Sequence, residues 1–182
     1  MNFLVRRGID VDKYTFDAVF ENIKHLVSSD GSSDMQEIWG WLIDYKPDKT
    51  DDYVICHSDF HFGNIIYDKH AVTGVVDWGK TRFCDAEYDI ASTLILLDMI
   101  YRRFTYSPQF IISTLRGYLF WMYLSEYRKH RPIDMGKLQY YKALISFHHL
   151  LMLKKRNISD VLFQETYEFY QGQLEKSMQF FQ

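Results

Sequence analysis

The sequence predicts a mainly helical α+β domain with one small β-hairpin. Apolar residues recur at three- and four-residue spacing over most of the 182-residue chain, which is the period of an amphipathic helix. Only one stretch, in the middle third, contains short β-type runs separated by turn residues. The chain is 47% hydrophobic and 18% aromatic, enough for one sizeable core, so we expect residues 1–182 to form a single domain.

Two leading helices are expected in residues 1–52. Apolar positions at helical spacing predict the first helix over roughly 14–28. After a Ser/Asp/Gly linker, Ser33 and Gln36 form a capping-box pattern. This pattern predicts a second helix that starts at Ser33 and ends near Pro47.

The β-type runs predict one strand followed by a hairpin. Residues 53–56 form the strand, and residues 65–67 and 72–76 form the two arms of the hairpin around a polar turn. Antiparallel strands joined by a tight turn return the chain beside its starting point. We therefore expect Asn64 and Asp77, which flank the hairpin, to be neighbours.

The remainder, residues 80–182, is expected to be a helical base. Asp85 occupies the N-cap position before a long apolar helix, and Asp89, one turn later, complements the helix dipole. Cap and first-turn signatures predict that further helices begin at Ser107-Pro108, Asp134 and Ser159.

The polar stretch between the strand and the hairpin has the spacing of a phosphotransferase active site. A kinase catalytic loop uses an Asp to accept or orient the substrate hydroxyl, an Asn five residues later to hold Mg²⁺, and a second Asp at a strand end to bind the same metal. Asp59, Asn64 and Asp77 follow in this order and at this spacing. Mg²⁺ keeps several waters, so one amide oxygen, one carboxylate and the nucleotide phosphates are sufficient ligands.

Around this motif the chain resembles the aminoglycoside phosphotransferases and their choline, homoserine and macrolide kinase relatives. That family usually has H-G-D-x-H-x-x-N, I-D-W or I-D-F, and G-D-x-x-x-D-L-A, where this chain has H-S-D-F-H-F-G-N, V-D-W and C-D-A-E-Y-D-I-A. The match covers roughly residues 50–100. Two departures replace a usual Gly. We expect Ser58 to leave the loop intact because it is small, and Cys84 to alter a turn because Gly tolerates positive φ and Cys does not.

The resemblance implies the C-terminal lobe of a protein kinase-like fold, with the hairpin carrying the metal ligands. It implies Mg²⁺- and ATP-dependent phosphoryl transfer to a hydroxyl of a small molecule, either aminoglycoside-like or an amino-alcohol. Asp59 is then the catalytic residue, and Asn64 and Asp77 bind the metal and the nucleotide.

Three further residues are expected to support the loop. His57 either braces the loop or transfers a proton, and we favour bracing because Asp59 is the more natural base. His61 is expected to pack or to hydrogen-bond within the loop. In the resembling family the second Asp of the third motif, here Asp89, helps to hold the catalytic loop.

The sequence lacks a counterpart of the nucleotide-binding N-lobe. None of its nine glycines forms a G-x-G-x-x-G pattern, and no lysine before His57 lies in an apolar β-type run. We therefore expect residues 53–79 to be the catalytic loop and metal hairpin of a C-terminal lobe alone, with the N-lobe absent. Such a chain is a truncated or split form, or a lobe that works with a separate N-lobe partner.

The competing function is a non-catalytic module. An orphan lobe would bind a ligand or a protein through the apolar face that an N-lobe covers, and such a face favours a homodimer.

Composition excludes several partners. The formal charge of −3 gives no broad basic field, so we expect no nucleic-acid partner. The apolar runs are too short to cross a bilayer, so we expect no membrane partner. Two cysteines, Cys56 and Cys84, are too few for a disulfide framework, which favours reduced thiols in a cytoplasmic protein.

His57, Asp59 and His61 also suggest a zinc or iron hydrolase site. This alternative leaves Asn64 and Asp77 unexplained. The adjacent pair His148-His149 is a poor chelate because helical neighbours point about 100° apart, and we expect one of the two in the core and one at the surface.

Overall fold

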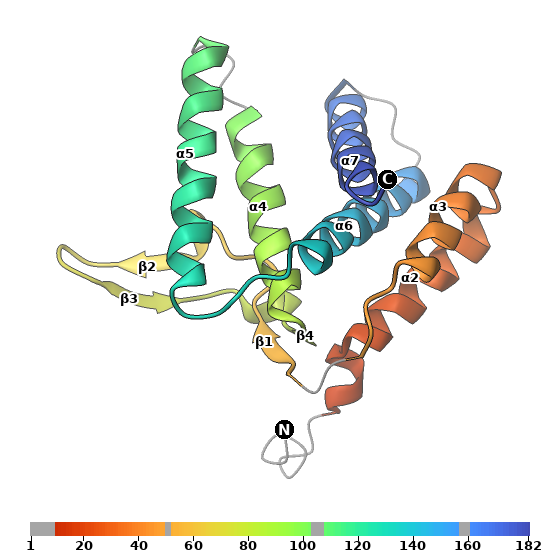
Figure 1. Cartoon of the computed structure of the whole chain (residues 1–182), viewed down its shortest axis with the longest axis horizontal. Helices are drawn as coiled ribbons and strands as arrows, with labels where there is room; N and C mark the ends of the chain where they lie inside the picture. Colours follow the sequence, from red (N-terminus) through yellow and green to blue (C-terminus); the bar gives the residue numbers. More distant parts are fainter. Residues whose placement is uncertain (1–9, 50–51, 103–107, 157–160) are drawn as a thin grey trace.

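The computed structural model describes residues 10–49, 52–102, 108–156 and 161–182. The expected helix starts at Ser107 and Ser159 lie outside these ranges. The mainly helical α+β class is confirmed, and Figure 1 shows a helical body from which one β-hairpin projects on the side opposite the leading helices.

The leading helices are α2 (Phe16–Asp30) and α3 (Ser33–Asp44), preceded by a short 3₁₀ turn, Val11–Tyr14. The Thr15 side chain caps α2 by accepting a hydrogen bond from the Ala18 amide, and Gly31 ends it with φ of 70°. The buried positions of α2 are spaced three and four apart, as the sequence pattern predicts: Phe16, Val19, Phe20, Ile23 and Val27.

The capping box expected at Ser33 is wrong. Ser32 is the N-cap of α3, and its carbonyl accepts the Gln36 amide at 3.2 Å. Ser33 is already helical, and its hydroxyl donates to the Asp34 carboxylate at 3.0 Å. This local bond with the next side chain replaces the reciprocal bonds of a capping box.

Within the described ranges, four short strands form two separate two-stranded antiparallel sheets. The predicted strand is β1 (Val54–Cys56), and the predicted hairpin consists of β2 (Ile65–Tyr67) and β3 (Val72–Val75). The strand β4 (Arg82–Cys84) pairs with β1 and was not predicted. Its three residues show no alternation of polar and apolar side chains, so only the pairing partner reveals it.

The helical base consists of α4 (Ala86–Arg102), α5 (Gln109–Arg128), α6 (Met135–Arg156) and α7 (Val161–Gln179). Helix α6 is central, because it packs against α2, α3, α4 and α7 (Figure 1). Its side chains Leu144, Phe147 and Leu150 are almost fully buried. The Tyr140 hydroxyl donates to the Leu42 carbonyl at 3.0 Å, which ties α6 to α3.

Both expected N-cap positions at the start of α4 and α6 are confirmed, but the two carboxylates act differently. Asp134 accepts the Lys137 amide at 3.0 Å, as a cap does. The Asp85 carboxylate is buried and accepts instead from the Tyr141 hydroxyl and the Lys137 ammonium. It therefore joins α4 to α6. Within the described ranges, no helix has both the length and the apolar character needed to cross a bilayer.

Candidate active site

The loop between β1 and β2 is held by the first turns of α4. The Asp89 carboxylate accepts the Ser58 amide at 2.7 Å, and the Ser92 hydroxyl donates to the Ser58 carbonyl, also at 2.7 Å. Two side chains one helical turn apart thus fix both main-chain groups of Ser58. Burial raises the pKa of the Asp89 carboxyl, and its bond to the loop partly opposes that shift.

Of the expectations for the two replaced glycines, the one for Cys84 is wrong, whereas Ser58 leaves the loop formed but in an unusual backbone conformation. Ser58 has φ of 65°, in the left-handed region that Gly tolerates and other residues rarely adopt. Cys84 lies in β4, paired with Val54 of β1, and has no positive φ. The turn that requires Gly-like freedom is therefore at Ser58, where it presents Asp59.

Replacing Ser58 with Gly should stabilise the protein. A non-Gly residue in the left-handed region costs roughly 1–2 kcal/mol, and the Ser58 hydroxyl oxygen is buried without a hydrogen-bond partner. The greater chain entropy of unfolded Gly offsets part of this gain, so we expect Ser58→Gly to raise the free energy of unfolding by about 1 kcal/mol. Urea denaturation measures it. Ser58→Ala, which keeps the strained φ, should gain less, and equal gains would contradict the account.

His57 is placed as a brace. The side chain is 3% exposed, and both ring nitrogens contact main-chain groups. Nδ1 accepts a hydrogen bond from the Asp59 amide at 3.3 Å, so Nδ1 carries no proton in this arrangement. The Nε2–H group then donates to the Val76 carbonyl at 2.9 Å. The ring also lies 4.6 Å from that of Trp78. His57 thus joins the loop to the end of the hairpin, and main-chain groups engage both of its ring nitrogens.

The zinc or iron alternative finds no support in the geometry. Among the residues described, no group of three His, Cys, Asp or Glu side chains converges on a metal position. His61 Nδ1 accepts the Gly63 amide at 3.0 Å and caps the 3₁₀ turn Phe62–Asn64. The histidines of the motif are therefore occupied by the loop itself.

The carboxylate of Asp59 pairs with a lysine that the sequence motif did not indicate. Asp59 Oδ2 lies 3.0 Å from the Lys80 ammonium, with the Asp59 side chain 13% exposed and that of Lys80 62% exposed. Lys80 comes from the 3₁₀ turn Trp78–Lys80 that follows Asp77. No periodicity or motif marks it. Only the fold brings it to Asp59.

The hairpin brings Asn64 beside the residue that precedes Asp77, as the spacing predicts. The Val76 amide donates to the Asn64 carbonyl at 2.9 Å, and the Asn64 Nδ2 donates to the Asp59 main-chain oxygen at 2.9 Å. Asn64 is buried and this bond fixes its amide, which leaves Oδ1 as the atom that could bind a metal. Asn64 therefore links the loop to the hairpin.

Asp77 also occupies a special backbone position. Its φ and ψ are 62° and 56°, it is exposed, and no hydrogen bond within the described chain caps the following turn with its carboxylate. One amide oxygen, from Asn64, and one carboxylate, from Asp77, are the kind of oxygen donors that Mg²⁺ prefers. The residues at this end of the hairpin fit a magnesium ion.

The two cysteines flank this site as buried, free thiols. Burial raises the pKa of Cys84 to about 12 and also raises the pKa of Cys56. Neither thiol has the thiolate character that nucleophilic chemistry requires. Of the pair His148-His149, His149 is exposed, as expected of one member, whereas His148 is half-buried and not in the core.

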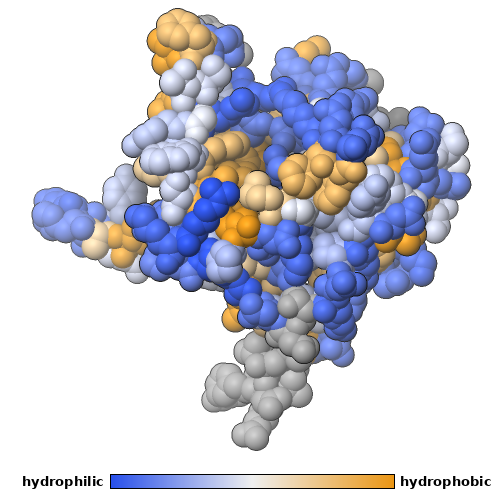
Figure 2. All heavy atoms as spheres, in the orientation of Figure 1, coloured by the Kyte–Doolittle hydropathy of each residue, from blue (hydrophilic) through white to orange (hydrophobic). Residues whose placement is uncertain are grey.

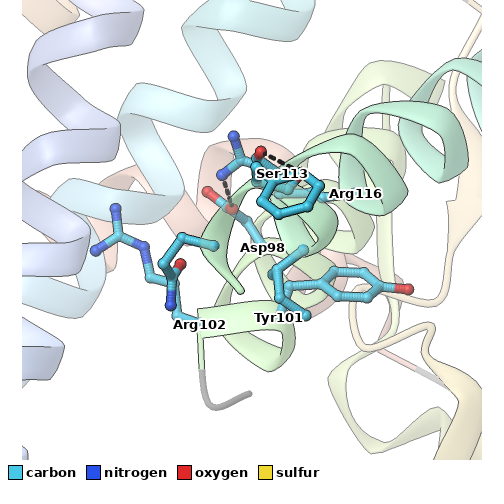
Figure 3. Close-up of a pocket in the computed structure, with 8 residues that line it drawn as sticks. Asp98, Tyr101, Arg102, Ser113 and Arg116 are labelled. Carbon is cyan, nitrogen blue, oxygen red and sulfur yellow. Dashed lines mark hydrogen bonds and ion pairs between the residues drawn. The ribbon is translucent and has the colours of Figure 1, made fainter. Parts of the chain in front are cut away.

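A pocket of about 490 Å³ lies at the far end of α4, away from the loop. Figure 3 shows Arg116 directed at Asp98, with 2.7 Å between Nη1 and Oδ1, and Asp98 also accepts from Gln173 of α7. None of the predicted site residues lines this pocket. Asp98 and Arg116 are already paired, and the Arg102 guanidinium lies 5.0 Å from the centroid of the Phe169 ring, so we assign these charged groups to stability.

Comparison with known proteins agrees with this geometry. The family model described as "Phosphotransferase enzyme family" matches residues 11–133, which is more than half of the chain. No curated protein matches the sequence. A crystal structure of a thermostable mutant of aminoglycoside phosphotransferase APH(4)-Ia in its apo form is similar, with a TM-score of 0.52 and 19% identity. The similarity covers 79% of this chain and 42% of that one. The chain belongs to the phosphotransferase enzyme family.

Proposed function

We propose that this chain carries the metal-binding and acceptor-orienting part of a phosphotransferase that moves the terminal phosphoryl group of Mg-ATP to a hydroxyl of a small molecule. The observation that supports this most is the bonding of Asn64, whose side chain is fixed to Asp59 and whose main chain is fixed to Val76. One residue thereby sets the position of the expected base relative to the expected metal ligands.

In this proposal Asp59 orients the acceptor hydroxyl and takes its proton as the bond to phosphorus forms. Asn64 Oδ1 and the Asp77 carboxylate would hold Mg²⁺, which when bound supplies positive charge to the phosphates. The Lys80 ammonium, 3.0 Å from Asp59, adds a second positive charge beside the acceptor position. His57 and Asp89 keep the loop in place through the bonds described above.

The chain spans less than half of the length of the similar solved structure. We propose that the nucleotide binds this chain through its Mg²⁺ and also meets a further protein surface, a separate N-lobe. The two free thiols are consistent with a reducing, cytoplasmic setting, which is part of the proposal.

A calorimetric titration of Mg-ATP into the chain tests the proposal. Loss of even an outer-shell partner of a metal typically weakens metal binding by 10–100-fold, so removing a direct ligand should cost at least about tenfold. We expect Asp77→Asn to lose that much affinity for Mg-ATP. Asp44→Asn, which removes the same charge from the exposed end of α3, is the matched control and should bind like the wild type. Equal affinity in Asp77→Asn and wild type, or no binding by either, would contradict the proposal.

A second candidate is the non-catalytic binding module, and one observation favours it. Within the described chain, α5 has no buried residue and exposes large apolar side chains, among them Phe110, Tyr118 and Trp121. Gel filtration at increasing concentration discriminates. A dimer that dissociates in Trp121→Ser while Mg-ATP binding is absent would favour the module.

A further inference from the structure

A pocket of about 260 Å³ lies beside Asp59. Ser58, Asp59 and Lys80 line it, together with side chains of α4, α6 and α7, whereas Asn64 and Asp77 do not. Under the proposed function, a cavity that contains the base but not the metal ligands is where the acceptor binds. The chemistry of its wall therefore describes the acceptor.

Most of the wall is apolar. Ile95 and Leu96 from α4 face Ile145 and Met152 from α6 across the pocket. Figure 2 shows apolar side chains gathered in the hollow between α4 and α7 on this face of the molecule. Such a surface binds the hydrocarbon part of a ligand, at roughly 25 cal/mol for each Å² removed from water.

A flat polar wall closes one side of the pocket. The imidazole of His149 stacks on the ring of Tyr170, with 4.5 Å between the centroids and 14° between the planes. His149 Nδ1 is held by the Ile145 carbonyl at 2.8 Å. A ring or another planar part of a ligand fits against this stacked pair.

The charge of the lining is positive. Its acidic side chain is Asp59, which Lys80 already pairs, and its other cation is Arg82. The Arg82 guanidinium donates to the Thr81 carbonyl at 2.7 Å and makes no ion pair within the described chain. The neighbouring carboxylate Asp89 is occupied by the Ser58 amide. The pocket thus holds an unpaired guanidinium and no unpaired carboxylate.

We infer that the acceptor is an alcohol with an apolar body and an anionic or hydrogen-bond-accepting group for Arg82, and that it is not a polycation of the aminoglycoside kind. This inference rests on the proposed function and narrows its substrate class. An ammonium group that enters the pocket loses its hydration, meets two cations and finds no free carboxylate. A carboxylate at the same place forms charge-assisted hydrogen bonds with the planar fork of Arg82.

Three alcohols that share one scaffold test the inference: 4-(hydroxymethyl)benzoate, 1,4-benzenedimethanol and 4-(aminomethyl)benzyl alcohol. Ligand-observed NMR titrations of the chain without nucleotide give their relative affinities. We expect the carboxylate to bind about tenfold more tightly than the ammonium, with the neutral diol between them. Arg82→Gln should remove most of this preference. Arg82→Lys should keep part of it because the charge remains, and Arg156→Gln, at the exposed end of α6, should leave it unchanged.

Tighter binding of the ammonium, no binding of any of the three alcohols, or an unchanged preference in a folded Arg82→Gln variant would overturn the inference. Its failure is separable from that of the proposed function. If Mg-ATP binds and depends on Asp77 while the alcohols show the wrong order, only the acceptor class is wrong. If the alcohols bind in the expected order and Mg-ATP does not bind, the pocket is a ligand site outside phosphoryl transfer, and the inference about an acceptor falls with the function.

Discussion

Asp59→Asn should lower the rate of phosphoryl transfer by about a thousandfold while leaving Mg-ATP affinity close to that of the wild type. A positioned general base contributes roughly 10²–10⁴-fold, and an amide in its place can hydrogen-bond the acceptor hydroxyl but cannot take its proton. The metal side should be unaffected, because Asn64 bonds to the main-chain oxygen of residue 59 and not to its carboxylate. Formation of ADP in the presence of the best-binding alcohol measures the rate.

The same variant should remain as stable as the wild type. The ion pair that it removes involves a Lys80 side chain that is 62% exposed, and exposed pairs contribute between nothing and about 1 kcal/mol. Urea denaturation provides this control. Lys80→Met distinguishes the effect of the Lys80 charge on the rate from that of Asp59, because it keeps the carboxylate of Asp59 and removes only the ammonium group. If the transfer rate of Asp59→Asn is within about threefold of the wild-type rate, Asp59 is not the general base. A positioned general base contributes at least roughly a hundredfold, which is well above that limit.

Asp89→Ala should disturb both stability and transfer. Its carboxylate is the partner of the Ser58 amide, and removing it leaves a part-buried donor without an acceptor. An unsatisfied buried donor costs about 1–3 kcal/mol, so we expect a loss near 2 kcal/mol. Ser58 in its left-handed conformation would then lose one of its two restraints, and a base displaced by about 1 Å lowers a rate by about a hundredfold.

Asp89→Asn distinguishes the effect of positioning the loop from the effect of the charge of Asp89. Asp89→Asn keeps an oxygen that can accept the Ser58 amide, so it should recover most of the stability and most of the rate. Urea denaturation and ADP formation are measured on both variants. An Ala variant that transfers at the wild-type rate, or an Asn variant no better than Ala, would show that the Asp89–Ser58 bond does not position the loop.

The parts of the fold that the sequence predicts are those encoded by local periodicity. The apolar spacing of α2 corresponds to its buried face except at Leu26, which is half-buried, and the hairpin follows from two β-type runs around a polar turn. The strand β4 has no such periodic pattern in its sequence. Its three residues become a strand because β1, which precedes it by more than twenty residues, provides the hydrogen-bonding edge.

The site shows the same division between local and tertiary information. Asp59, Asn64 and Asp77 are readable because kinase chemistry fixes their spacing. Lys80 is not readable, because its pairing with Asp59 depends on the direction of the turn after the hairpin.

The exchange of roles between Ser58 and Cys84 has a related cause. A residue type indicates which φ values have low energy, but it does not indicate which φ the surrounding hydrogen bonds impose. Asp89 and Ser92 impose the left-handed conformation on Ser58, whereas pairing with β1 keeps Cys84 extended.

We propose that Asn64 and Asp77 hold the divalent metal of a nucleotide at the base of the hairpin. Paramagnetic broadening of the backbone amide signals by Mn²⁺ with ATP, compared with Mg²⁺ and ATP, locates the metal directly. We predict selective loss of the signals of Asn64, Val76 and Asp77, with α2 and α3 unaffected, and no such loss in Asp77→Asn. Broadening that centres elsewhere, or that persists unchanged in Asp77→Asn, would contradict the assignment of this site.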